Sequence, residues 1–137
     1  MVRAASMLAC LVPLLALSGC LGLGGSLGTA SPSLGPSNPA VNALGEGLVG
    51  RIPGLKLNAS ERARALEAEF QALQFTAAGQ PVTWTADGVE GSVVPTQLYR
   101  VGSQDCRAFS HTVKANGRAS AGQGTACRGE GGVWKVV

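Results

Sequence analysis

The sequence predicts an α+β fold, with one N-terminal helix packed on a small antiparallel β-meander of about five strands behind a disordered leader. Three observations predict it: a single segment with helical periodicity, a series of short strand-like runs separated by turn residues, and two cysteines at the ends of one predicted hairpin. The net charge of +3 comes from scattered basic residues, and only 14% of the 137 residues are charged. Such a weak bias argues against a nucleic-acid partner.

Residues 1–19 have the layout of a secretory signal peptide. Arg3 precedes an apolar run from Ala4 to Leu17, and the small residues Ser18 and Gly19 follow. The run is shorter than the ~20 residues that a membrane-spanning helix needs. We therefore expect this segment to be removed on export.

The end of the signal, Leu17 to Cys20, reads LSGC and resembles the bacterial lipobox. In a lipobox the cysteine becomes the first mature residue, and its thiol is the nucleophile that attaches the diacylglycerol. Fatty acyl chains such as palmitate contribute about 0.8 kcal/mol per buried CH₂, so several chains anchor a protein without a spanning helix. Leu21 stands where an aspartate is usual for inner-membrane retention. We predict lipidation at Cys20 and a place in the cell outer membrane, with the periplasmic or surface face left open.

Residues 20–56 are predicted to form a flexible tether. Glycine, proline and serine are frequent, aromatic residues are absent, and the only charges are Glu46, Arg51 and Lys56. A chain of this composition buries too little surface to offset the entropy of ordering it. Glycines four residues apart occur twice, which also matches helices packed in a membrane, but the turn-rich surroundings favour a linker.

The folded domain is predicted to span residues 57–137 and to begin with a helix, NASERARALEAEFQALQF. Asn58 is the predicted cap, with Glu61 three residues on as in a capping box, and Ser60 is the alternative cap. An apolar stripe is predicted to pack on the sheet, and it consists of Ala59, Ala63, Leu66, Phe70 and Leu73. The glutamates are predicted to lie on a solvated face, and they are Glu61, Glu67 and Glu69.

Strand-like runs fill the rest of the chain and are separated by turn residues. They are residues 81–85, 90–95, 96–101, 106–115, 118–128 and 133–137. Asp87-Gly88 is a predicted hairpin turn, and Asn116-Gly117 is the strongest hairpin signal of the sequence. We combine these runs into a meander of about five short antiparallel strands.

The two-residue loop at Asn116-Gly117 fixes the register of the strands that it joins. Counting outward along both strands, Cys106 faces Cys127 in a non-hydrogen-bonded pair, where Cα atoms lie about 4.5 Å apart. That distance is at the short end of the range for disulfides. The same register pairs Asp105 with Arg128 and Phe109 with Gly124. A β-bulge at one of the strand glycines would shift this pairing.

Cys106 and Cys127 are therefore predicted to form a structural disulfide. Cys10 leaves with the signal peptide and Cys20 carries lipid, so these two remain as a pair in an oxidising compartment. A metal site needs about four ligands, and the mature chain adds only His111, on the opposite face of the strand from Cys106. A redox couple needs closely spaced cysteines. We predict no metal and no cofactor, and a stabilisation of about 3 kcal/mol from the cross-link.

Four motifs follow the lipobox, the Gly-rich leader and the helix: GQPVTW at 79–84, VVPTQLYRVGSQDCRAF at 93–109, GTACR at 124–128 and GVWK at 132–135. Over about residues 45–137 the sequence thereby resembles the "17 kDa surface antigen" family of bacterial outer-membrane lipoproteins. The resemblance implies an antigenic lipoprotein of the outer membrane and no established reaction. The leader departs from family members that carry a full glycine-zipper segment, so the resemblance does not imply a membrane-embedded leader.

The remaining candidates for chemistry are few. His111 is predicted to fill space or face water in its strand, because neither Asp87 nor Asp105 belongs to a motif that orients a catalytic histidine. The aromatic residues are predicted to form the core rather than a ligand platform, and they are Trp84, Tyr99, Phe109 and Trp134. The sequence therefore predicts that the protein is not an enzyme.

Arg107 and Arg128, each directly after a cysteine, are the predicted functional outliers, placed to contact an anionic surface. Together these observations predict a lipid-anchored outer-membrane surface antigen with a non-catalytic structural or interaction role. Its predicted partners are the membrane, through the lipid on Cys20, and an envelope protein or peptidoglycan. The alternative is a tethered periplasmic binding or inhibitor module, comparable to small lipoproteins that block proteases or lysozyme.

Overall fold

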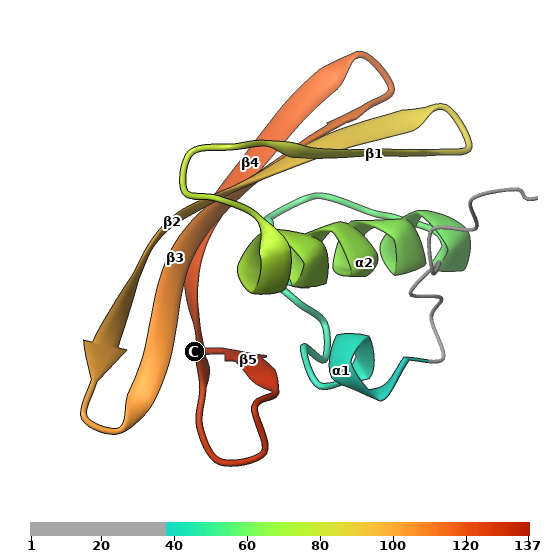
Figure 1. The fold of residues 1–137 in the computed structure, drawn as a ribbon. Coiled ribbons are helices and arrows are strands. Elements are labelled where there is room, and N and C mark those ends of the chain that lie inside the picture. The colour runs from blue at the N-terminus through green and yellow to red at the C-terminus, as the bar shows by residue number, and fades with distance from the viewer. Residues whose placement is uncertain (1–37) are drawn as a thin grey trace, which may run out of the picture. The chain divides into compact units, whose positions relative to one another are not determined.

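The computed structural model describes residues 38–137 (Figure 1). The predicted signal peptide, Cys20 and the first part of the predicted tether lie outside these residues. The described elements are α1 (Pro39–Asn42), the 3₁₀-helix η1 (Val49–Arg51), α2 (Ala59–Phe75), β1 (Val82–Ala86), β2 (Val89–Val101), β3 (Gln104–Ala115), β4 (Arg118–Arg128) and β5 (Trp134–Val136).

The five strands form one antiparallel sheet in sequential order, and α2 packs on one face of it (Figure 1). This confirms the predicted α+β class. The strands β2, β3 and β4 form a curled sheet that extends past α2 as a long β2–β3 hairpin. No helix within residues 38–137 is both long and apolar enough to cross a membrane.

The predicted capping box starts α2. The Asn58 side chain accepts a hydrogen bond from the Glu61 backbone N–H at 2.9 Å, and the Glu61 carboxylate accepts one from the Asn58 N–H at 2.7 Å. At the other end the Thr76 hydroxyl donates to the Gln71 carbonyl at 3.0 Å. At both ends of the helix, side chains therefore bind backbone N–H or C=O groups near the positions where the helix itself supplies no partner.

The buried face of α2 is broader than the predicted stripe. Phe70 and Leu73 are buried as expected, whereas Ala59 is exposed at the first turn. The rest of the apolar contact comes from three alanines, namely Ala65, Ala68 and Ala72. The prediction of a solvated glutamate face is wrong, because the carboxylate-bearing side of the helix is itself covered. The buried glutamates are Glu61, Glu67 and Glu69.

Both predicted hairpin turns are present, and each has positive φ at both central residues. The φ angles are 49° and 82° at Asp87-Gly88, and 51° and 73° at Asn116-Gly117, which is the left-handed geometry of a type I′ turn. The β3–β4 register is continuous and contains the predicted pairs: Cys106 with Cys127, Asp105 with Arg128, and Phe109 with Gly124.

The bulge lies in β2, between Pro95 and Leu98. It joins two runs that the sequence predicted as separate short strands into one 13-residue strand. The sheet is therefore built of longer strands than predicted, although their number of five agrees.

The predicted disulfide between Cys106 and Cys127 is present, with the two Cα atoms 4.1 Å apart. Side chains alternate along β3, so Cys106 points to the opposite face from Arg107, which contacts α2. The cross-link therefore lies on the face of the sheet that α2 does not cover.

Residues 38–56 are part of the core, and their assignment to the tether is wrong. Five of their side chains are at most 5% exposed, and these are Val41, Leu44, Leu48, Val49 and Ile52. Leu48 and Ile52 lie over Gly122 and Gly124 of β4, where an added Cβ would come within 3.0–3.1 Å of them. Because the two glycines have no side chains, β4 has room for apolar residues of the segment 38–56, called the leader below. Composition alone does not reveal this complementarity between the leader and β4.

Candidate functional site

A buried polar cluster lies between α2 and the sheet. Glu69 of α2 and His111 of β3 have no exposed surface, and Trp84 of β1 is 7% exposed. His111 Nδ1 lies 2.7 Å from Glu69 Oε1, and Trp84 Nε1 donates to His111 Nε2 at 2.9 Å. The cluster therefore connects three elements of the fold through side chains.

The hydrogen bonds define the protonation of this cluster. An indole N–H only donates, so His111 Nε2 accepts, and the proton of the neutral ring is on Nδ1, which donates to Glu69. Glu69 Oε1 also accepts from the Val49 N–H at 2.8 Å, and Oε2 accepts from the Leu48 N–H at 2.9 Å. Every partner of Glu69 is a donor, as an ionised carboxylate requires.

Gly47 is required beside this carboxylate. Its φ is +64°, and an added Cβ would collide with Glu69 Oε2 and with the Leu66 side chain. The chain can therefore bring the amides of residues 48 and 49 to the carboxylate only because residue 47 has no side chain.

The His111–Glu69 pair has the order of a histidine and its orienting carboxylate in hydrolases. Here Nε2, which would face a nucleophile, is occupied by the Trp84 indole, and neither partner reaches solvent. The cluster holds α2, β1, β3 and the leader together. The burial of Glu69 in this cluster was not predicted, because the helix pattern gives no sign that the distant backbone amides of Leu48 and Val49 approach it.

Arg107 is a second buried charged residue, and the expectation that it contacts an anionic surface is wrong. It is 7% exposed. Its Nη1 donates to the carbonyls of Ala72 and Leu73 at 3.1 and 3.0 Å. Nη2 donates to Thr76 O and Thr96 O at 2.9 Å, and Nε to Thr96 O at 3.0 Å. The guanidinium thus binds the open carbonyls at the end of α2 together with one carbonyl at the β2 bulge.

Arg128 lies apart from these carbonyls and keeps part of its surface. It contacts Asp105 Oδ2 and Gln74 Oε1, both at 3.3 Å, and its guanidinium lies 5.1 Å from the centre of the Trp134 ring. Burial lowers the pKa of the Arg107 guanidinium, and the positive charge of Arg128 lowers it further. Because Arg107 faces inward and Arg128 is bound to Asp105 and Gln74, the two arginines do not form a joint binding site for an anionic surface.

The burial of Arg107 could have been predicted from the alternation of side chains along β3. It shares its face of β3 with Phe109 and His111, both buried. Of the predicted core aromatics, Trp84, Phe109 and Trp134 are buried, whereas Tyr99 is 44% exposed. The prediction of an aromatic core is therefore wrong for Tyr99, which pairs with Cys106 and so points to the face of the sheet that α2 does not cover.

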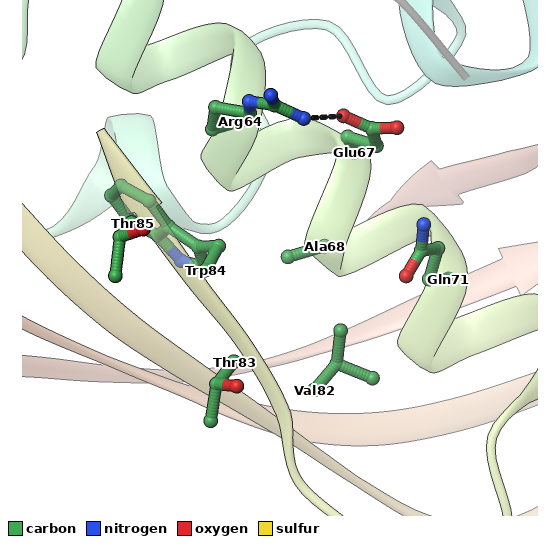
Figure 2. A pocket seen from close by; sticks show the side chains of 8 residues that line it. All are labelled: Arg64, Glu67, Ala68, Gln71, Val82, Thr83, Trp84 and Thr85. Atoms are coloured by element: carbon green, nitrogen blue, oxygen red, sulfur yellow. Dashed lines mark hydrogen bonds and ion pairs between the residues drawn. The ribbon is translucent and has the colours of Figure 1, made fainter. Parts of the chain in front are cut away.

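A surface hollow of about 370 Å³ lies between α2 and β1 (Figure 2). From α2 it is lined by Arg64, Glu67, Ala68 and Gln71, and from β1 by Val82, Thr83, Trp84 and Thr85. Its one ion pair joins Arg64 Nη1 to Glu67 Oε2 at 3.3 Å. The lining contains neither a histidine nor a cysteine.

A hollow of about 380 Å³ lies beside β1 and β2 and is lined largely by threonine, serine and the Glu90–Lys114 ion pair. Across residues 38–137, no three histidine, cysteine or acidic side chains gather in a group that fits a metal ion.

Two comparisons with known proteins give the same family description. Residues 71–135 match the family described as "17 kDa outer membrane surface antigen". A "17 kDa surface antigen" of Rickettsia felis is 37% identical over 70 residues, which are 49% of this chain and 44% of that protein. The chain thus spans less than half the length of this relative. No solved structure matches the chain. The matched residues contain β1 to β4, the first two residues of β5 and both disulfide cysteines.

Proposed function

We propose that this chain belongs to the family of 17 kDa outer membrane surface antigens, which residues 71–135 match, and that it is a lipid-anchored protein of the cell outer membrane with a non-catalytic structural or interaction role. The family match carries this proposal. The lipobox-like LSGC sequence at Cys20, which follows a signal-like apolar run, supplies the anchor.

The use of the polar groups supports a non-catalytic role. Glu69, His111 and Arg107 are the described side chains best suited to chemistry, and all three are engaged by neighbouring residues of the fold. A catalytic base needs hydrogen-bond access to a substrate proton. A disulfide, moreover, suits a small domain that must stay folded outside the cytoplasm.

The test is Cys20→Ser in the full chain, expressed in a bacterium with two membranes, with Cys10→Ser as the matched control. The wild type and Cys10→Ser are expected to take up labelled palmitate and to sediment with the outer membrane in a sucrose gradient. Cys20→Ser is expected to lose the label and leave the outer-membrane fraction, because only Cys20 provides the acylated thiol. Unchanged labelling and sedimentation of Cys20→Ser would contradict the anchor.

A further inference from the structure

The two edges of the sheet differ in how they are covered. At β5, Arg51 of the leader donates from Nη2 to Val136 O at 3.2 Å and from Nη1 to Val137 O at 3.3 Å. At β1, the opposite edge, no strand among residues 38–137 pairs with the outer side. An uncovered edge presents main-chain donors and acceptors to any extended chain that reaches it.

The register identifies the free groups of β1. Ala86 and Val89 flank the two-residue turn and form a hydrogen-bonded pair, and the pattern alternates from there. Thr83 and Thr85 therefore direct their N–H and C=O groups away from β2. The strand between residues 82 and 86 contains no proline, lysine or bulge of the kind that blocks strand addition at natural edges.

The hollow described above lies along this free edge. All of its lining residues belong to α2 and β1, so it opens where the sheet ends (Figure 2). Its helix side is a row at positions 64, 67, 68 and 71, the spacing of one helix face. Ala68 is the smallest member of that row and leaves a gap between Arg64 and Gln71. An added strand therefore has α2 beside it and room for an inward side chain above Ala68.

We propose that the free edge of β1 and the facing row of α2 bind an extended peptide segment of a partner protein, which adds as a sixth strand and carries an acidic side chain. This inference rests on the interaction role proposed above and names the surface and the chemistry of the partner. Main-chain hydrogen bonds to Thr83 and Thr85 hold the segment, and the groove selects its side chains.

The charge at the groove favours an acidic residue. The Arg64 side chain is 58% exposed, whereas that of its partner Glu67 is 11% exposed. The accessible charge of the groove is thus a guanidinium, which binds a carboxylate through two parallel hydrogen bonds. Gln71, toward the other end of the row, offers both a donor and an acceptor.

The position of α2 indicates that an extended segment without a covering helix fits the β1 edge better than a second copy of this chain does. α2 packs on β1 more extensively than on β2 or β3. A twofold antiparallel pairing of two β1 edges would place two α2 helices on the same face, above strands only about 4.8 Å apart. Helices pack at axial distances of about 8–10 Å, so a segment without a covering helix fits this edge better.

The edge is tested with Thr83→Pro, and Thr83→Val is the matched control. Proline removes the outward N–H of residue 83 and leaves the β1–β2 ladder intact, whereas valine changes only the side chain. Random nine-residue peptides displayed on phage are selected on the purified full-length protein in detergent, with Thr83→Pro as the counter-target. The affinity of the enriched peptides for each variant is then measured, and backbone amide shifts locate the binding.

We expect enriched peptides that alternate β-branched residues and contain an acidic residue. They should bind the wild type and Thr83→Val equally and Thr83→Pro about tenfold more weakly, because an edge hydrogen bond is lost and the proline ring obstructs the strand. Arg64→Glu should weaken the acidic peptides, whereas Arg62→Glu, outside the lining of the hollow, should not. Amide shifts should centre on Thr83 and Thr85.

Three results would overturn the proposal. One is the absence of any peptide that distinguishes the wild type from Thr83→Pro, and another is amide shifts centred on a different surface. The third is a dimer, measured by light scattering, that Thr83→Pro dissociates, because a second copy would then occupy the edge. None of these results bears on palmitate labelling of Cys20, so failure of the docking site and failure of the anchor are distinguishable.

Discussion

Among the charged side chains buried at the α2–sheet interface, Glu69 and Arg107 are each satisfied in a different way. Glu69 gathers donors: two backbone N–H groups and the His111 ring. Arg107 gathers acceptors, and all of its hydrogen bonds go to backbone carbonyls. Neither side chain depends on an ion of opposite charge. Backbone dipoles therefore do here what counter-ions do in a buried salt bridge.

The two residues also join different parts of the chain. Glu69 connects α2 to the leader at residues 48 and 49, and through His111 to the sheet. Arg107 connects β3 to the end of α2 and to the β2 bulge. Glu69 is completely buried, whereas Arg107 keeps 7% of its surface. We expect that substitution of Glu69 costs more stability, because water cannot reach the groups that it leaves.

The largest effect is expected for Glu69→Gln. The amide NH₂ must face at least one of three donors, so the variant should lose about 3 kcal/mol of unfolding free energy. Glu67→Gln is the matched control, and its loss should stay below about 1 kcal/mol because Glu67 pairs with an exposed arginine. Urea unfolding of the oxidised protein measures both, and amide exchange at Leu48 and Val49 should accelerate only in Glu69→Gln. Equal losses in the two variants would show that Glu69 does not hold the leader.

How much of this interface the sequence predicts depends on the range of the interactions. The cap of α2 and the β3–β4 register depend on residues close in sequence, namely Asn58 with Glu61 and the turn at Asn116-Gly117, and both predictions are confirmed. The burial of Glu69 depends on amides 20 and 21 residues away. No single-segment pattern contains that information.

The leader also shows that a prediction from one segment omits long-range contacts, because here the contacts order a segment that was predicted to be a tether. Its glycines and prolines predicted a tether, and the counting of residue types obscured the apolar residues spaced among them. Leu48 and Ile52 are buried because Gly122 and Gly124 leave space on β4. Composition therefore describes the tendency of an isolated segment, and the order of residues 38–56 comes from a complementary surface far along the chain.

A smaller effect is expected for Arg107→Met. Methionine fills much of the buried volume but leaves the carbonyls of Ala72, Leu73 and Thr76 without their donor, and a loss of about 2 kcal/mol follows. Some of these carbonyls lie near the surface, where water replaces the guanidinium in part. Arg128→Met is the control, with a loss below about 1 kcal/mol for a partly exposed ion pair. Amide exchange in the last turn of α2 should accelerate in Arg107→Met alone, and uniform acceleration along α2 would contradict the local role.

The smallest effect is expected for Trp84→Phe, which removes the donor to His111 Nε2 and keeps an aromatic ring in the edge-to-face arrangement with the histidine. The loss should be about 1 kcal/mol, the net value of one hydrogen bond. The guanidinium of Arg107 has only donor atoms, whereas each ring nitrogen of His111 can donate or accept. The protonation of His111 therefore gives the clearest test of the hydrogen bonds around Glu69. In the wild type, ¹⁵N NMR should show the His111 proton on Nδ1 and a bare Nε2, because the indole fixes that tautomer. In Trp84→Phe, Nε2 is free of the indole, and the Nε2 signal should move from its wild-type position. A wild-type spectrum with the proton on Nε2 would mean that the indole does not donate to His111 and that Glu69 receives one donor fewer than the geometry assigns.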